Sequence, residues 1–108
     1  MSIRAKIINE SLKRYHQGDI VRHFKYETLS DEDKANKKYL YEIIGYGKHA
    51  ETCEELVIYK ALYLTTDTEA KFWVRSIDMF MDKVDTFKYP DIKQPYRFML
   101  CDKNGELL

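Results

Sequence analysis

A chain of 108 residues, 44% of them apolar and 33% charged, is long enough for one globular domain and too short for two. The 18 basic and 18 acidic side chains cancel, which argues against a nucleic-acid or membrane partner recognised through net charge. The charge is uneven along the chain, because residues 1–26 carry six basic and two acidic side chains, whereas residues 27–55 carry four basic and eight acidic ones. We interpret this as two solvated surfaces; the alternative is a basic N-terminal surface that meets an anionic partner.

The two cysteines and the absence of apolar runs bear on the compartment. Cys53 and Cys101 lie far apart without a Cys-x-x-Cys spacing, so we expect free thiols rather than a zinc ribbon or a disulfide framework. The N-terminus lacks the continuous apolar stretch of a signal peptide, and no segment approaches the roughly 18 apolar residues of a membrane span. The sequence therefore predicts a cytoplasmic protein with no membrane partner.

Residues 1–17 are predicted to form an amphipathic helix that packs on the rest of the chain. Apolar side chains recur there at spacings of three and four: Ile3, Ile7, Ile8, Leu12 and Tyr15. Gly18 follows a basic last turn, so it can end the helix in the left-handed conformation.

Residues 18–87 are predicted to form a small β-barrel. Alternation over residues 20–25 favours a first strand, and the highly charged residues 26–38 favour an exposed loop with room for one helical turn. Residues 39–47 and 55–63 are rich in β-branched and aromatic side chains and flank a polar connector, which predicts an antiparallel hairpin.

The second arm of this hairpin carries apolar side chains on both faces, with Val57 and Tyr59 on one and Leu56 and Ile58 on the other. A strand that is apolar on both faces is typical of the centre of a sheet or the wall of a barrel. If the Leu56 and Ile58 face lies in the core, truncating either side chain is expected to be destabilising.

The remaining chain is predicted to close the barrel and then cover it. Residues 72–75 favour a short strand, residues 76–80 a helical turn capped by Ser76, and residues 81–87 a final strand. Two prolines punctuate residues 88–108, so this stretch is predicted to be a C-terminal extension packing on the barrel. Within it, residues 96–100 can cover a sheet edge or add one more strand.

Several ordered segments carry a family resemblance. They are Gly-Asp-Ile-Val-Arg-His-Phe-Lys at 18–25, Tyr-Glu-Ile at 41–43, His-Ala-Glu-Thr at 49–52, Glu-Glu-Leu-Val-Ile-Tyr-Lys-Ala-Leu-Tyr at 54–63 and Trp-Val-Arg-Ser-Ile-Asp-Met-Phe at 73–80. Together they resemble the family catalogued as domain of unknown function 1653, a group of small bacterial proteins. The resemblance implies an SH3-like β-barrel and brings no established activity and no catalytic residues.

The chain departs from the family pattern in two loops. The long charged stretch 26–38 stands where a short glycine-containing turn is usual, and residues 64–67 replace a Gly-Asp turn. Ser76 also stands where proline is common, which is compatible with the same turn. A binding site built from the loop after Tyr63 would therefore differ in this chain.

Nine polar or aromatic side chains are candidates for ligand binding. They are Arg22, His23, Tyr41, His49, Glu51, Tyr59, Tyr63, Trp73 and Arg75. Aromatic side chains supply contact area in a concave site, and arginine supplies planar recognition of anions. The alternative is that Tyr59, Tyr63 and Trp73 fill the core, because a small domain needs large side chains to bury enough area.

Arg75 is the candidate for which the sequence makes the most specific prediction. Strand alternation places Trp73 and Arg75 on the same side, and an unpaired buried guanidinium is costly. Arg75 is therefore expected at the rim of the aromatic face with a carboxylate partner, for which Glu42, Glu51 and Glu55 are the candidates. There it would either meet an anionic ligand group or form an ordinary salt bridge.

Patterns for catalysis are weak in this sequence. His49 and Glu51 with His23 could hold a metal ion, but the second half of a zinc deaminase motif is missing. Cys53 beside His49 has no third group to orient the pair, and the chain has no phosphate-binding glycine loop. We therefore predict no catalytic residue, metal or cofactor.

The predicted function is a non-enzymatic binding or adaptor module that uses the aromatic and arginine-bearing face of a small barrel. Its partner is a protein, a small anionic ligand or RNA, and the sequence does not select among them. The alternatives are an RNA- or nucleotide-binding domain, which the basic N-terminus favours, and a small metal-dependent enzyme.

Overall fold

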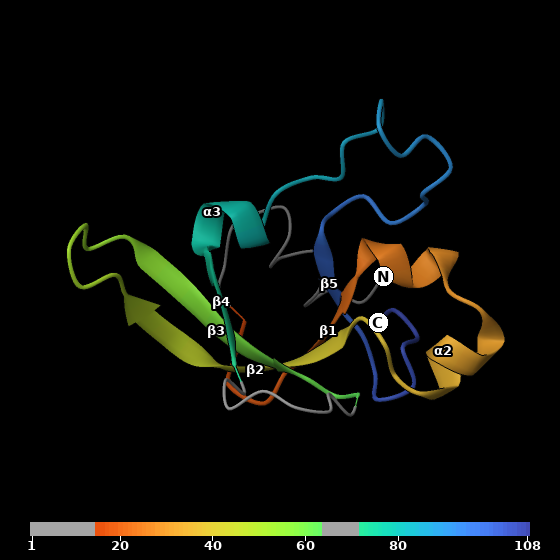
Figure 1. Ribbon diagram of the computed structural model, residues 1–108, viewed down its shortest axis with the longest axis horizontal. Coiled ribbons are helices and arrows are strands. Elements are labelled where there is room, and N and C mark those ends of the chain that lie inside the picture. The colour runs from red at the N-terminus through yellow and green to blue at the C-terminus, as the bar shows by residue number, and fades with distance from the viewer. Residues whose placement is uncertain (1–14, 64–71) are drawn as a thin grey trace.

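The structure is a computed structural model that describes residues 15–63 and 72–108 (Figure 1). The predicted N-terminal helix falls almost wholly outside these residues, so it stays a prediction. The described residues form an antiparallel sheet with a few short helical segments, which confirms a mainly β fold.

The five strands lie in the order β4-β3-β2-β1-β5. Their bounds are Ile20–His23 for β1, Leu40–Lys48 for β2, Glu55–Ala61 for β3, Trp73–Ser76 for β4 and Phe98–Leu100 for β5. Within the described part of the chain the sheet is open, with β4 and β5 at its edges. Closure into an SH3-like barrel stays a prediction.

The predicted hairpin is confirmed in β2 and β3, which pair over their full length and project from the rest of the molecule (Figure 1). The register shifts between Ile43, which faces Tyr59, and Gly45, which faces Ile58, so one extra residue forms a bulge there. In the turn, Nδ1 of His49 accepts hydrogen bonds from the backbone N–H groups of Glu51 and Thr52.

Two short helical segments occupy the charged stretch that was expected to be mainly a loop. The 3-10 helix η1 (Phe24–Thr28) buries two aromatic side chains, Phe24 and Tyr26. The α-helix α2 (Asp31–Ala35) buries none, and its N-cap Ser30 accepts a hydrogen bond from the backbone N–H of Asp33.

The predicted helical turn after β4 is also confirmed. Helix α3 (Ile77–Phe80) begins at Ser76, whose hydroxyl accepts a hydrogen bond from the backbone N–H of Met79. This helix lies over the β2–β3 hairpin (Figure 1) and inserts the fully buried Phe80 into the core.

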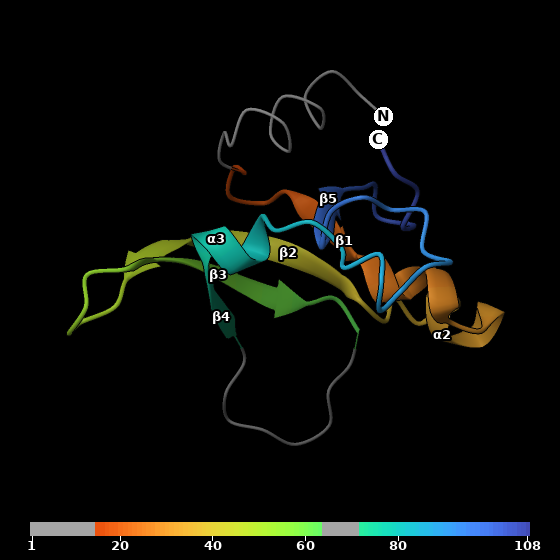
Figure 2. The same ribbon diagram turned by 90° about the horizontal axis from the view of Figure 1, so that it is seen from above.

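The prediction of a final strand at residues 81–87 is wrong. This stretch contains a single β-bridge, between Lys83 and Tyr96, because aspartate side chains fold its backbone into turns. Oδ1 of Asp82 accepts from the N–H of Lys83, and Oδ1 of Asp85 accepts from two further N–H groups. The chain runs from α3 past η1 and returns to enter β5 (Figures 1 and 2), so a strand from the C-terminal stretch completes the sheet beside β1.

The main core lies on one face of the sheet. Its buried residues are Tyr15, Val21, Tyr41, Ile43, Val57, Tyr59, Phe80, Met81, Phe98 and Leu100. Phe80 and Phe98 stack with their ring centroids 4.1 Å apart. The Val57 and Tyr59 face of β3 is therefore the core face, whereas Leu56 and Ile58 are half-buried. A smaller cluster of Tyr26, Leu40 and Cys101 lies on the other face.

Candidate functional site

A basic cleft opens where the ends of β1 and η1 meet β4 and the chain leading into β5. Its lining residues are His23, Phe24, Lys25, Arg75, Asp82, Lys83, Val84, Asp85, Lys88, Tyr89 and Arg97, and its volume is about 460 Å³. Pockets of this size accommodate small ligands. We call this the basic cleft.

His23 forms part of the cleft at the end of β1. Its Nδ1 accepts a hydrogen bond from the backbone N–H of Lys25, so the side chain caps η1. Its ring stacks on Phe24 and contacts Phe98 edge-on. Burial, followed by the positive charges of neighbouring Lys25 and two arginines, lowers the pKa of His23 from 6.5 to about 4. His23 is therefore neutral at pH 7, in a surrounding of positive charge.

Arg75 enters the cleft from β4. It faces Val57 in the strand register, as Trp73 faces Tyr59, so the two side chains share a face as predicted. Its Nε donates a long hydrogen bond of 3.4 Å to the hydroxyl of Tyr59, and its guanidinium lies 6.0 Å from the ring centroid of Phe98.

The expected carboxylate partner of Arg75 is not found, since no described carboxylate lies within ion-pair distance of it. Glu42 pairs with Lys60 in the register and shares the other face of the sheet with Ile20 and Leu40. Glu51 lies in the turn of the hairpin, and Glu55 is exposed at the start of β3. Tyr59 and Phe98 thus contact Arg75 where a carboxylate was predicted.

Arg97 lies beside Arg75 in the lining of the cleft. Its backbone is fixed, because its N–H donates to the carbonyl of Asp82 and its own carbonyl accepts from the N–H of Phe24. Its Nε is buried, and no described group accepts a hydrogen bond from it. Buried polar atoms in native proteins are rarely left without a partner, so this donor marks a place for an acceptor.

Lysines complete the wall of the cleft around one tyrosine. Nζ of Lys25 lies 5.9 Å and Nζ of Lys88 lies 5.5 Å from the ring centroid of Tyr89. The same ring contacts Phe24 edge-on. The tyrosine ring is therefore within cation–π distance of two ammonium groups that line the cleft.

The lining carries more positive than negative charge. Its cations are Lys25, Arg75, Lys83, Lys88 and Arg97, and its anions are Asp82 and Asp85, which gives five minus two, or +3. Both aspartates accept backbone N–H groups of their own turns. None of the five cations forms an ion pair with a described residue.

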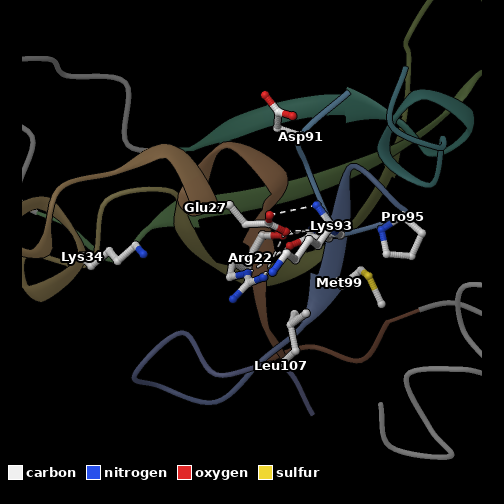
Figure 3. A pocket seen from close by; sticks show the side chains of 9 residues that line it. Arg22, Glu27, Lys34, Asp91, Lys93, Pro95, Met99 and Leu107 are labelled. Atoms are coloured by element: carbon white, nitrogen blue, oxygen red, sulfur yellow. Dashed lines mark hydrogen bonds and ion pairs between the residues drawn. The ribbon is translucent and has the colours of Figure 1, made fainter. Parts of the chain in front are cut away.

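Arg22 alternates with His23 along β1, so it lies on the other face of the sheet, where it lines a second hollow (Figure 3). This Arg22 pocket has a volume of about 650 Å³ and is lined by Arg22, Glu27, Lys34, Asp91, Lys93, Gln94, Pro95, Met99 and Leu107. Arg22 donates to Gln94 Oε1 at 2.9 Å and to the Gly105 carbonyl at 3.0 Å, and lies 3.7 Å from Glu27. All three nitrogens of the Arg22 guanidinium are therefore used by the fold.

Gln94 and Glu27 tie the same pocket to the backbone. Gln94 is 2% exposed, and its Nε2 donates to the carbonyls of Arg22 and Tyr96. The Glu27 carboxylate accepts the N–H groups of Lys93 and Gln94. These bonds hold the returning C-terminal chain against β1 and η1.

The other candidates from the sequence are dispersed. Tyr41 and Tyr59 are buried in the core, where their rings meet edge-on at 5.2 Å. Burial, with the neighbouring hydroxyls of Tyr63 and Tyr59, raises the pKa of Tyr41. Trp73 is 38% exposed on β4, and Tyr63 lines a third hollow beside α2.

His49 and Glu51 lie in the exposed β2–β3 turn, apart from His23 at the far end of β1. Within residues 15–63 and 72–108, no group of three or more His, Cys, Asp or Glu side chains could hold a metal ion. The exposed Cys53 follows His49 in this turn, and the buried Cys101 has its pKa raised to about 12, chiefly by burial.

The structure thus brings two of the nine predicted residues, His23 and Arg75, to one cleft. Sequence reasoning missed Lys25, Lys83, Lys88, Tyr89 and Arg97. The available signal was the density of lysine and aspartate around residues 82–88, a stretch that was mostly assigned to the final strand at 81–87 instead.

Comparison with known proteins places the chain in a family. The family described as "Protein of unknown function (DUF1653)" matches residues 19–100, and the chain belongs to it. No curated protein and no solved structure is significantly similar to the chain. Among the described helices, none has the length and apolar character needed to cross a membrane.

Proposed function

We propose that this protein is a non-enzymatic binding module whose basic cleft holds an anionic group of a small ligand. The observation that carries the proposal is the set of five cations that line the cleft without an ion pair to any described residue. Like charges gathered in one concavity repel one another, and an anion bound among them relieves that repulsion.

Preorganisation supports the same proposal. Arg75 is steadied by the Tyr59 hydroxyl and by the ring of Phe98, both of which belong to the core. Arg97 is fixed through its backbone and keeps a buried donor free. Groups that are held in place before binding lose little conformational entropy when a ligand arrives.

Titration of the full chain with sulfate at constant ionic strength tests the proposal, with the His23 ring resonances as the reporter. We expect saturable shifts of these resonances, and a loss of affinity in Arg75→Gln. Lys48→Gln removes the same charge from an exposed site outside the cleft and is expected to leave affinity unchanged. Equal losses in both variants, or shifts that follow ionic strength alone, would contradict a defined anion site.

An RNA- or nucleotide-binding domain is the second candidate function. Phe72 is 52% and Trp73 38% exposed at the β4 end of the sheet, close in sequence to Arg75. Exposed aromatic rings beside cations are typical of surfaces on which unpaired bases stack. Binding of a single-stranded oligonucleotide that weakens steeply with salt and is lost in Trp73→Ala would favour this candidate.

A protein adaptor and a metal-dependent enzyme gain no specific support from the described residues. We also propose that the chain forms an SH3-like barrel with an N-terminal helix and belongs to a cytoplasmic bacterial protein, which the family resemblance and the composition support.

A further inference from the structure

We infer that the group bound in the basic cleft is a phosphate dianion carried by a small molecule. This inference rests on the proposed function and narrows it to one ligand chemistry. It follows from the net charge of the cleft, from the different elements that supply its hydrogen-bond donors, and from the contacts that its aromatic rings already make.

Charge favours a group with more than one negative charge. The lining carries +3, and His23 adds nothing at pH 7 because its imidazole is neutral. A phosphate monoester carries about −1.5 to −2 at this pH, whereas a single carboxylate carries −1. A phosphate therefore compensates more of the cleft's charge in the same volume.

The donors reach the cleft from several elements. Arg75 comes from β4, Arg97 immediately precedes β5, Lys25 belongs to η1 and Lys88 to the chain between α3 and β5. A tetrahedral phosphate offers three terminal oxygens that point apart and accept from separate directions. A planar carboxylate presents its two oxygens along one edge and is best matched by one arginine fork.

The aromatic rings of the cleft are already in contact with other groups. Tyr89 holds the ammonium groups of Lys25 and Lys88 and meets Phe24 edge-on, while His23 stacks on Phe24. A base that stacked on Tyr89 would displace these contacts. The cleft therefore suits a compact charged group better than a strand of bases.

Calorimetric titration of the full chain at low salt and pH 7.5 tests the inference with three probes. Glycerol 3-phosphate and inorganic phosphate represent an esterified and a free phosphate, and succinate is a dicarboxylate of similar charge. We expect both phosphates to bind at least about tenfold more tightly than succinate, since a directed Arg–phosphate contact is worth on the order of a factor of ten. The tighter of the two phosphates identifies the source.

Matched variants locate the site. Arg97→Gln is expected to weaken glycerol 3-phosphate at least about tenfold, and Lys88→Gln by a few-fold, because a lysine acts as a point charge. Lys48→Gln, outside the cleft, is expected to change affinity less than about twofold. If Arg97→Gln unfolds, Arg97→Lys keeps the charge, and a loss of affinity with it still supports the inference.

The outcomes separate this inference from the proposed function. Succinate that binds as tightly as phosphate, with Arg75→Gln still impaired, overturns the phosphate assignment and leaves the anion site standing. An oligonucleotide that binds more tightly than glycerol 3-phosphate and competes with it also overturns the assignment. Absence of binding by every probe, together with unmoved His23 resonances under sulfate, overturns both.

Discussion

Arg22 on β1 and Arg75 on β4 look equivalent in the sequence, yet the structure places them in opposite circumstances. Every nitrogen of the Arg22 guanidinium has a protein partner, in Gln94, Gly105 and Glu27. Figure 3 shows Arg22 beside Glu27 in this pocket. Arg75 has one long hydrogen bond, to Tyr59, and no described carboxylate near it.

The difference shows how a structural cation can be told from one available to a ligand. A guanidinium whose donors are all used by the protein holds segments together. Its removal leaves the acceptors that it bonded without a donor. A cation without such partners, lying with others in a concavity, retains donors for an incoming anion. The Arg22 pocket and the hollow beside α2 are both larger than the basic cleft, so volume alone would not select the cleft.

The largest effect is expected in the core on which the basic cleft rests. Phe80→Ala removes a fully buried ring that stacks on Phe98, and Phe98 in turn lies beneath Arg75. We expect the free energy of unfolding to fall by about 3–5 kcal/mol in urea denaturation. The neighbouring Met79 is 51% exposed, so Met79→Ala is expected to change it by less than about 0.5 kcal/mol. Similar losses in both variants would mean that the core is misplaced.

Substitution of the two arginines tests the comparison directly. Arg22→Ala removes the donors of Gln94 Oε1 and of the Gly105 carbonyl and breaks the ion pair with Glu27, so we expect a loss of about 3 kcal/mol in unfolding free energy. Arg75→Ala, which breaks one long hydrogen bond, is expected to cost less than about 1 kcal/mol. Urea denaturation of both variants gives the contrast, and a reversed order would refute it.

A glycine beside Arg22 tests how tightly its pocket is built. Gly105 has φ +86°, and a Cβ there would lie 2.5 Å from the Tyr26 hydroxyl, whose ring Arg22 covers. We expect Gly105→Ala to cost about 2–3 kcal/mol, from the left-handed backbone plus the displacement of Tyr26. Gly18 has φ +89° in open space, so thermal denaturation of Gly18→Ala should show a loss of only about 1 kcal/mol. Equal effects would remove the argument for a tight pocket.

The elements that could be predicted are those whose structure depends on residues close together in the sequence. Alternation located β1, β-branched and aromatic composition located the hairpin, and a serine before a helical turn located α3. The short strand expected over residues 72–75 corresponds to β4. The pairing of β5 with β1 joins residues far apart in the sequence, and no local pattern specifies it. Turns made by Asp82 and Asp85 occupy the stretch where a final strand was expected.

The candidate site was less predictable than the fold for the same reason. Its two predicted members, His23 and Arg75, lie on strands that alternation could place. Arg97 joins them only because the C-terminal chain returns to β1, and Lys88 only because that chain passes η1 on its way. Which arginine lacks partners depends on these long-range contacts.

The pKa of His23 reports on the charge of the basic cleft. Its pKa of about 4 in the folded chain lies below the ordinary value of 6.5, so between these values the unfolded chain binds a proton that the folded chain does not. Stability therefore falls as pH decreases from about 6.5 to about 4, by about 2 kcal/mol after allowance for partial solvent exposure. The midpoints of urea denaturation, measured from pH 6.5 to pH 4, show how steeply stability depends on pH.

His23→Asn is the matched control, because asparagine keeps a side-chain acceptor for the N–H of Lys25 at the start of η1 but does not titrate. We expect most of the dependence on pH to disappear in this variant. NMR titration of the unsubstituted chain should further show the His23 pKa rising by at least about one unit when sulfate is bound, since the anion offsets Lys25, Arg75 and Arg97. A His23 pKa that stays near 4 at saturating sulfate would place the anion outside the cleft.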